Sequence, residues 1–281
     1  MAQRPMREVS SAALLWLATP QGYWIHSDGD IGAEDAGLQA HVRIAQMTAQ
    51  NTSIASNLAG IRERIAQSAA RVGRAADDIT LVAVSKTFPP EAIRSAYELG
   101  VRHFGENRVQ EWELKRAAAA DLDATWHLIG HLQSNKARRA ANLFNRVDSV
   151  DSVALAQKLD AAAASEAKRL KVLIEVHLGG EETKSGVQEE DLPALAESIA
   201  QLPNLELLGL MAIPPYFDES ERVRPYFRRL RELRDRVGTQ LGMPLDVLSM
   251  GMSHDFEIAI EEGATEIRVG TALFGERSKK A

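Results

Sequence analysis

The feature that most restricts the fold is a regular alternation of short apolar runs with longer amphipathic segments, from residue 79 to residue 269. Continuous apolar runs rich in β-branched residues predict buried parallel strands, and a repeat every three or four positions predicts helices. The predicted strands cover residues 79–84, 101–104, 125–129, 146–150, 171–177, 205–213, 246–250 and 265–269. The predicted helices between them cover residues 91–99, 108–120, 135–143, 153–170, 190–202, 219–237 and 254–262, and a leading helix covers residues 51–72.

This strict alternation implies parallel strands that are joined by helical crossovers. Eight strand–helix units match the size of a (β/α)8 barrel. A doubly wound open sheet is the alternative, but no G-x-G-x-x-G motif follows the first strand. We therefore expect an α/β protein with a single TIM barrel over residues 50–281. Residues 1–49 are expected to form a poorly structured, disordered N-terminal extension, and Met47 is a candidate for the natural start of the chain.

Composition excludes several classes of protein. The chain has 281 residues, 45% of them hydrophobic, so it can bury a large core. Its net charge of −6 predicts no general affinity for nucleic acid or acidic membranes. It has no cysteine, which excludes disulfides and thiolate metal sites. No apolar run approaches the ~20 residues of a membrane span. A cytoplasmic protein is expected.

Candidate binding residues follow the strands, because TIM barrels collect function at the carboxyl ends of their strands. The first strand ends just before Lys86. The alternative interpretation of Lys86 is an ordinary surface lysine that begins a loop. The last two strands run into Gly251 with Ser253 and into Gly270 with Thr271. A glycine followed by a hydroxyl residue at the start of a helix can bind phosphate or simply cap the helix. Because barrels place phosphate sites after strands seven and eight, the two loops together predict a phosphate cradle.

A lysine beside a phosphate cradle suits a ligand that carries both an aldehyde and a phosphate. Pyridoxal 5′-phosphate (PLP) fits this description, with Lys86 forming a Schiff base. The first and eighth strands are neighbours once a barrel closes, which brings the two features together. Arg268 lies two residues before Gly270 and so points to the same face of its strand. It either faces the pyridine nitrogen of the ligand or forms a salt bridge at the barrel rim.

Residues 52–280 closely resemble the pyridoxal-phosphate homeostasis protein family, single-domain relatives of the alanine racemase barrel. The matching motifs are Leu-Val-Ala-Val-Ser-Lys-Thr (81–87), His-Phe-Gly-Glu-Asn (103–107), Trp-His-Leu-Ile-Gly-His-Leu-Gln-Ser-Asn-Lys (126–136), Lys-Ser-Gly (184–186), Gly-Leu-Met-Ala-Ile-Pro (209–214), Ser-Met-Gly-Met-Ser (249–253) and Arg-Val-Gly-Thr-Ala-Leu-Phe-Gly (268–275). The chain departs from the family at His177-Leu178-Gly179, where Asn-Ile and a small residue are expected. Any role of His177 is therefore in doubt.

The resemblance implies a PLP barrel of fold type III in which Lys86 carries the Schiff base. It implies that Ser253, Gly270 and Thr271 bind the phosphate, that Arg268 faces the pyridine nitrogen, and that Asn107 lies beside the ring. The predicted cofactor-binding residues are Lys86, Asn107, Met211, Gly251, Met252, Ser253, Arg268, Gly270 and Thr271, with Lys136 and Lys184 as possible second lysines. The expected partners are PLP and PLP-dependent apoenzymes that receive it, and the chain is expected to be a monomer.

Two functions compete at this stage: a PLP carrier that buffers or delivers the cofactor without turnover, and a PLP-dependent amino-acid racemase. Racemisation needs a base on each face of the α-carbon. The similar alanine racemase barrel supplies its second base, a tyrosine, from an additional β-domain, for which we expect no room after Thr271. Only Tyr216 of the four tyrosines is expected near the barrel mouth. The carrier is the prediction. No metal site is expected, because the His127/His131 pair lacks the glutamate of H-E-x-x-H.

Overall fold

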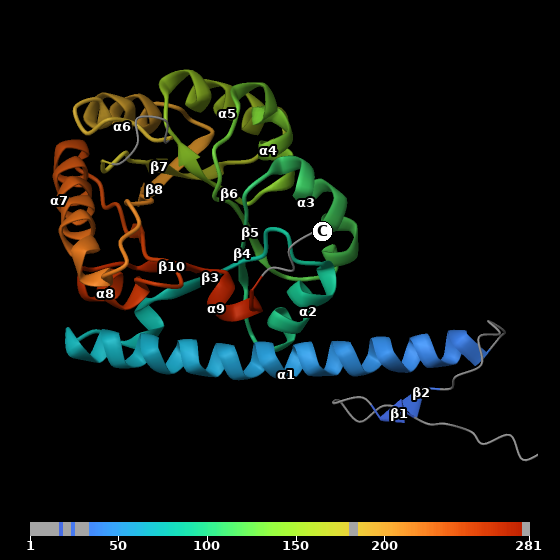
Figure 1. Cartoon of the computed structure of the whole chain (residues 1–281). Coiled ribbons are helices and arrows are strands. Elements are labelled where there is room, and N and C mark those ends of the chain that lie inside the picture. The colour runs from blue at the N-terminus through green and yellow to red at the C-terminus, as the bar shows by residue number, and fades with distance from the viewer. Residues whose placement is uncertain (1–16, 19–23, 26–33, 180–184, 277–281) are drawn as a thin grey trace, which may run out of the picture. The chain divides into compact units, whose positions relative to one another are not determined.

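The computed structural model describes residues 17–18, 24–25, 34–179 and 185–276, and their side chains from residue 51 onward (Figure 1). The chain forms two compact units, Met1–Thr48 and Ala49–Ala281. In the first unit, β1 (Leu17–Ala18) and β2 (Trp24–Ile25) pair antiparallel. The second unit contains the barrel, and the long helix α1 (Glu34–Arg71) belongs to both units. No helix within the described ranges is long and apolar enough to cross a membrane.

Eight parallel strands close into a barrel in the order β10-β3-β4-β5-β6-β7-β8-β9, and Figure 1 shows helices around this ring. The strands are β3 (Thr80–Val84), β4 (His103–Glu106), β5 (Thr125–Leu128), β6 (Arg146–Val150), β7 (Leu170–Glu175), β8 (Leu205–Met211), β9 (Val247–Ser249) and β10 (Glu266–Val269). The closing pair aligns Arg268 of β10 with Val82 of β3. The predicted TIM barrel is thus confirmed, and the open sheet is excluded.

Each crossover contains a helix close to its predicted position. These helices are α2 (Pro90–Glu98), α3 (Val109–Lys115), α4 (Ala137–Leu143), α5 (Val153–Ser165), α6 (Leu192–Ala200), α7 (Arg224–Leu241) and α8 (Phe256–Glu261), and α9 (Thr271–Phe274) follows the last strand. Short 3-10 turns η2 (Arg116–Ala119), η3 (Ser134–Lys136) and η4 (Ser220–Val223) adjoin α3, α4 and α7. A further turn, η1 (Ala76–Asp78), precedes β3. In α7 the buried Phe227, Leu230, Leu233 and Val237 form the apolar face that the sequence pattern predicts.

Helix α1 begins earlier than predicted. It starts at Glu34 rather than at Asn51, so it enters the segment that was expected to be a poorly structured extension. Residues 34–50 contain many good helix formers, such as alanine and glutamine, but no apolar repeat that would mark a helix in the sequence. Farther along α1 the repeat is clear, and Ile54 and Leu58 are buried in the barrel core. The domain boundary at residue 50 and the disorder of the extension remain predictions.

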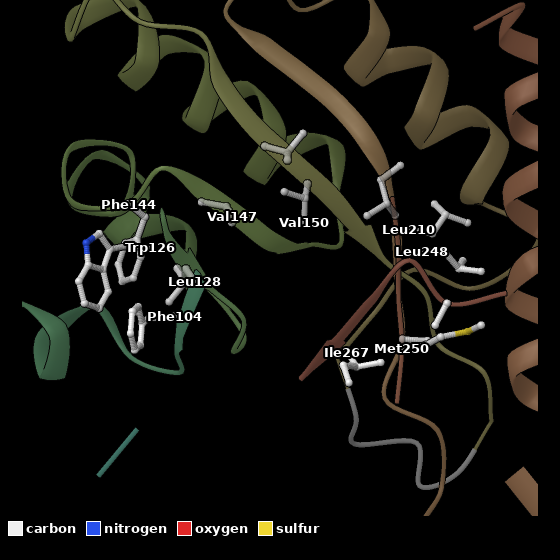
Figure 2. Packing of buried hydrophobic residues seen from close by; sticks show 14 of the residues in the cluster. Phe104, Trp126, Leu128, Phe144, Val147, Val150, Leu210, Leu248, Met250 and Ile267 are labelled. Atoms are coloured by element: carbon white, nitrogen blue, oxygen red, sulfur yellow. The ribbon is translucent and has the colours of Figure 1, made fainter. Parts of the chain in front are cut away.

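The outer faces of the strands pack against the helices through a continuous apolar core. Trp112 of α3 stacks on Trp126 of β5 with ring centroids 3.8 Å apart, and Trp126 stacks on Phe104 of β4 at 5.1 Å. Figure 2 shows Phe104, Trp126 and Phe144 gathered in one part of this core, with Leu210, Leu248, Met250 and Ile267 in another. These contacts stabilise the positions of the strands whose carboxyl ends carry the site.

A buried charge network lies between the amino-terminal parts of several strands. Arg146 donates to Glu266 at 2.5 Å and to Asp148 at 2.6 Å. The ring of His127 lies 3.2 Å from Asp148 and 3.0 Å from the ring of His103. Burial, followed by the charge of His127, lowers the pKa of His103 to about 4. His127, Asp148 and Glu266 are close enough to share a metal ion, but Arg146 already supplies the positive charge between the two carboxylates.

Candidate functional site

A cavity of about 370 Å³ opens at the carboxyl ends of the strands. Its volume lies within the ~300–1,000 Å³ range of small-molecule sites. Seven predicted binding residues line it: Lys86, Asn107, Met252, Ser253, Arg268, Gly270 and Thr271. The barrel therefore brings residues from its first strand and its last two loops into one cavity, as the alternation of strands and helices predicts.

Lys86 is the second residue after the end of β3, and hydrogen bonds hold the residues on both sides of it. On one side, the Ser85 hydroxyl donates to the buried carboxylate of Glu106 at 2.7 Å, and the Ser85 carbonyl accepts from Lys115 Nζ at 3.0 Å. On the other side, the Thr87 N–H donates to Glu111. These bonds determine where the chain leaves the strand, so the Lys86 side chain starts from a well-defined point in the cavity wall.

Thr87 has a left-handed backbone conformation, with φ of 67°. This region is sterically costly for a β-branched residue and persists only where surrounding contacts require it. Lys115 joins the contacts around it, because its Nζ lies 2.6 Å from Glu111 and 3.3 Å from Glu106. Burial raises the pKa of Glu106, and Lys115 opposes that shift. The network thus keeps a strained turn immediately after the predicted ligand-binding lysine.

The two glycine-containing loops after β9 and β10 form one wall of the cavity. They are joined by a hydrogen bond in which the Ala272 N–H donates to Ser253 Oγ at 3.3 Å. A Cβ atom added at Gly270 would lie 3.4 Å from both the Cβ and the carbonyl oxygen of Val84, so Gly270 packs closely on β3. Ser253, Gly270 and Thr271 are thereby placed on the same cavity as Lys86.

Met211 and Gly251 were predicted to bind the cofactor but are not among the residues that line the cavity. Met211 is fully buried in β8. Gly251 has φ of 90°, and a Cβ atom there would lie 2.6 Å from the Cβ of Ala259 on α8. Its carbonyl accepts from the Arg268 N–H at 3.0 Å. Gly251 therefore allows the loop after β9 to pack tightly on α8.

We expect Gly251→Ala to destabilise the protein by about 1–3 kcal/mol, because it combines a left-handed conformation with overpacking. Urea unfolding at neutral pH measures this loss. Gly242→Ala is the matched control, because Gly242 also has a positive φ of 63° but a Cβ there would meet nothing within 4 Å. Equal losses in both variants would show that the contact with α8 has no effect.

Arg268 is buried, and its guanidinium is held by two uncharged oxygens. It donates to Ser249 Oγ at 2.8 Å and to the Ala212 carbonyl at 2.8 Å. Burial lowers its pKa, while nearby carboxylates, Glu266 first, oppose that effect. Arg268 therefore lies in the wall of the cavity. Its hydrogen-bond partners are uncharged, whereas the alternative prediction was a salt bridge at the barrel rim.

Sequence analysis missed Glu175, the last residue of β7. The strand was predicted to continue to residue 177, which hid the fact that Glu175 lies at its carboxyl end. The carboxyl lines the cavity, and burial raises its pKa to about 7. A glutamate that ends an apolar run is the signal that could have identified it. His131 and His254 also line the cavity and were not predicted to bind the ligand.

The remaining candidates lie outside the cavity or outside the described residues. Lys136 ends the turn η3 and does not line the cavity, and Lys184 lies outside the described residues. His177 does not line the cavity either, and its N–H donates to the Val187 carbonyl at 2.9 Å. Tyr216 is 70% exposed, with its ring 5.3 Å from that of His254.

Comparison with known proteins agrees with this geometry. The profile of the alanine racemase N-terminal domain family matches residues 56–278. The pyridoxal phosphate homeostasis protein of Aquifex aeolicus is 50% identical over 220 residues, which is 78% of this chain and 96% of that protein. An alanine racemase from Clostridium difficile is 17% identical with a TM-score of 0.65 over 82% of this chain and 58% of its own, which shows a shared fold.

A solved structure of PipY from Synechococcus elongatus, described as having PLP bound, is 42% identical to this chain. It covers 79% of this chain and 100% of its own, with a TM-score of 0.71. The matches span the barrel with its cavity, and the curated relatives carry one common name. The chain belongs to the pyridoxal phosphate homeostasis protein family.

Proposed function

We propose that this protein binds pyridoxal 5′-phosphate in the cavity and takes part in its homeostasis, buffering or delivering the cofactor without a dedicated turnover reaction. One observation carries the proposal: Lys86 lines the same cavity as Ser253 and Thr271. The names of the relatives and the bound ligand described for PipY support it. We propose a cytoplasmic monomer, with PLP-dependent apoenzymes as recipients.

The residues present fit this ligand. Bound PLP supplies an aldehyde, which takes up an amine as a C=N bond with loss of one water. Lys86 would provide that amine, while Ser253, Gly270 and Thr271 would hold the phosphate. Arg268 would face the pyridine nitrogen, and Asn107 would lie beside the ring. An arginine next to this nitrogen disfavours its protonation and makes the ring a weak electron sink, which suits holding the cofactor better than reacting it.

An amino-acid racemase is the second candidate. Among the described residues no tyrosine lines the cavity, and Tyr216 is largely exposed, so the second base of alanine racemase has no evident counterpart. One side chain at the cavity could still serve as a base. His131 lines the cavity and its Nδ1 lies 3.3 Å from Asp151, so an oriented imidazole is present. An imidazole held in this way can act as a base.

The proposal is tested with purified protein and added PLP. We expect an absorption band of lysine-bound pyridoxal that borohydride makes permanent, with the added mass found on the peptide containing Lys86. Incubation with a PLP-dependent apoenzyme should then restore that enzyme's activity. Solvent-deuterium exchange at the α-carbon of a panel of amino acids separates the two functions. Rapid exchange would favour the racemase, and absence of the band together with no measurable affinity for PLP would contradict PLP binding.

The phosphate cradle gives a further prediction. Thr271→Val removes a hydroxyl that is expected to donate to the phosphate, so PLP affinity should fall by roughly 10-fold or more, as for a hydrogen bond to a charged group. Affinity for pyridoxal, which has no phosphate, should stay unchanged. Both are measured by fluorescence titration, with Thr239→Val on the exposed part of α7 as the control. Equal losses for both ligands would argue against a phosphate contact.

A further inference from the structure

His131 lies on a loop that is held between two neighbouring parts of the barrel. The loop follows β5, and Gly130 packs so closely on the loop after β4 that an added Cβ atom would clash with the Asn107 carbonyl oxygen. On the other side, the hydroxyl of Ser149 in β6 donates to the Gly130 carbonyl at 2.7 Å. The imidazole of His131 therefore starts from a defined position in the wall of the cavity that also contains Lys86.

A carboxylate orients this imidazole. Asp151 directly follows β6, and its Oδ2 lies 3.3 Å from His131 Nδ1. Because a carboxylate can only accept a hydrogen bond, Nδ1 carries the hydrogen, and Nε2 of the neutral ring keeps its lone pair. The Asp151 side chain is 17% exposed, whereas that of His131 is 53% exposed. The His131–Asp151 pair thus combines a held imidazole with access to water.

The proposed bond between Lys86 and PLP requires proton transfer in both directions. When the Lys86 amine attacks the aldehyde carbon, a C=N bond replaces the C=O bond, and both amine hydrogens leave with the oxygen as water. In release, one water adds to the carbon, its oxygen stays there as the aldehyde, and its two hydrogens return to the Lys86 nitrogen. Nothing is oxidised or reduced. A side chain that alternately accepts and donates a proton accelerates both directions.

We propose that His131 transfers these protons, with Asp151 as its positioning residue, so that the His131–Asp151 pair sets how fast PLP is taken up and released. This inference rests on the proposed function. His131 Nε2 accepts a proton from the attacking amine or water and returns it to the departing oxygen or to the Lys86 nitrogen. A cofactor carrier needs such a group, because a C=N bond that breaks slowly retains the cofactor whatever its affinity.

Two other titratable side chains in the cavity are less suited to this role. Glu175 is only 6% exposed, so it exchanges protons with bulk water less readily than the half-exposed His131. His254 Nε2 donates to the Phe217 carbonyl at 3.1 Å. An uncharged carbonyl stabilises the protonated ring less than a carboxylate does. His131 is therefore the cavity side chain whose surroundings best support both the loss and the gain of a proton.

The test measures the rates and the equilibrium of the bond separately in the wild type and in His131→Gln. The band of lysine-bound pyridoxal grows at saturating PLP and decays after dilution below the dissociation constant. Glutamine can still bond to Asp151 but cannot take up a proton, so both rates should fall by the same factor, roughly 100-fold. The dissociation constant should stay unchanged, because a proton carrier lowers the barrier equally in both directions. A histidine that only supported the cavity would change the dissociation constant instead.

Further variants separate the two members of the pair. Asp151→Asn should slow both rates, and the double variant should be no slower than His131→Gln, because Asp151 acts through His131. Free imidazole should partly restore both rates in His131→Gly and leave those of the wild type unchanged. His177→Gln is the matched control, because His177 does not line the cavity, and it should keep wild-type rates and affinity. Thermal unfolding checks that each variant is folded.

Two results would overturn the inference: wild-type rates in His131→Gln, or a slowing in one direction only with a changed dissociation constant. Absence of the band together with no measurable affinity for PLP in the wild type would instead overturn the proposed function. The two failures are therefore distinguishable.

Discussion

Lys86→Ala is expected to abolish the absorption band of lysine-bound pyridoxal and to raise the PLP dissociation constant by at least about 100-fold, which corresponds to about 2.7 kcal/mol. The covalent attachment is lost, while the phosphate contacts after β9 and β10 remain and hold the ligand weakly. The absorption spectrum measures the loss of the band, and the borohydride-fixed mass measures the loss of the covalent attachment. A fluorescence titration measures the dissociation constant.

Lys136→Ala is the matched control for this experiment, because Lys136 does not line the cavity. It should keep the band and the affinity of the wild type. After borohydride treatment of Lys86→Ala, mass spectrometry would also reveal whether Lys136 or Lys184 accepts the ligand in its place. An unchanged band, still fixed by borohydride with the affinity of the wild type, would contradict the assignment of Lys86.

Arg146→Met is expected to lower the free energy of unfolding by about 3–5 kcal/mol, the cost of removing one partner from a buried ion pair. The variant leaves Asp148 and Glu266 buried without their cation, and both side chains are at most 3% exposed. Urea unfolding at pH 7 measures the loss. Arg139→Met removes a half-exposed arginine that pairs with Glu113, and it should change stability by less than about 1 kcal/mol.

The loss in Arg146→Met should also depend on pH. Burial acts to raise the pKa of Asp148 in the folded protein, but its charged neighbours outweigh burial and lower the pKa. Arg146 has the largest lowering effect among them. A lowered carboxyl pKa stabilises the fold above the unfolded pKa of about 3.9, and that contribution is lost as pH falls through the folded value. The difference between wild type and variant should therefore shrink below pH 4. A constant difference from pH 7 to pH 3 would show that the ion pair is not its source.

The barrel and most of its site could be predicted because they depend on local patterns. Apolar runs mark the strands. The residues that follow a run lie at the carboxyl end of that strand, whatever its position in the barrel. This rule identified Lys86 and Thr271 as candidates. The charge network could not be predicted, because Arg146 and Glu266 are 120 positions apart and meet only when the ring closes. No local pattern marks a contact of that kind.

The other misses have equally physical causes. Helix α1 extends to Glu34 through residues of high helix propensity that carry no apolar repeat. Glu175 was hidden by a two-residue error in the end of its strand. Met211 is fully buried in β8, and Gly251 packs against α8, so neither lines the cavity in this structure, and their contact with the cofactor stays a prediction. Adjacency in sequence therefore did not decide which residues reach the cavity.

The pairing of β10 with β3 has a consequence for how binding relates to folding. Residues 80–83 pair with residues 266–269 at this seam, and Lys86 and Thr271 lie just beyond its two strands. A folding intermediate that lacks this seam has the predicted phosphate cradle at one edge of an open sheet and the lysine at the other. The ligand can therefore contact both sides only after the ring has closed. Bound to both sides, it would act afterwards as a clamp that slows opening of the ring, with a gain in stability that grows with the logarithm of its concentration.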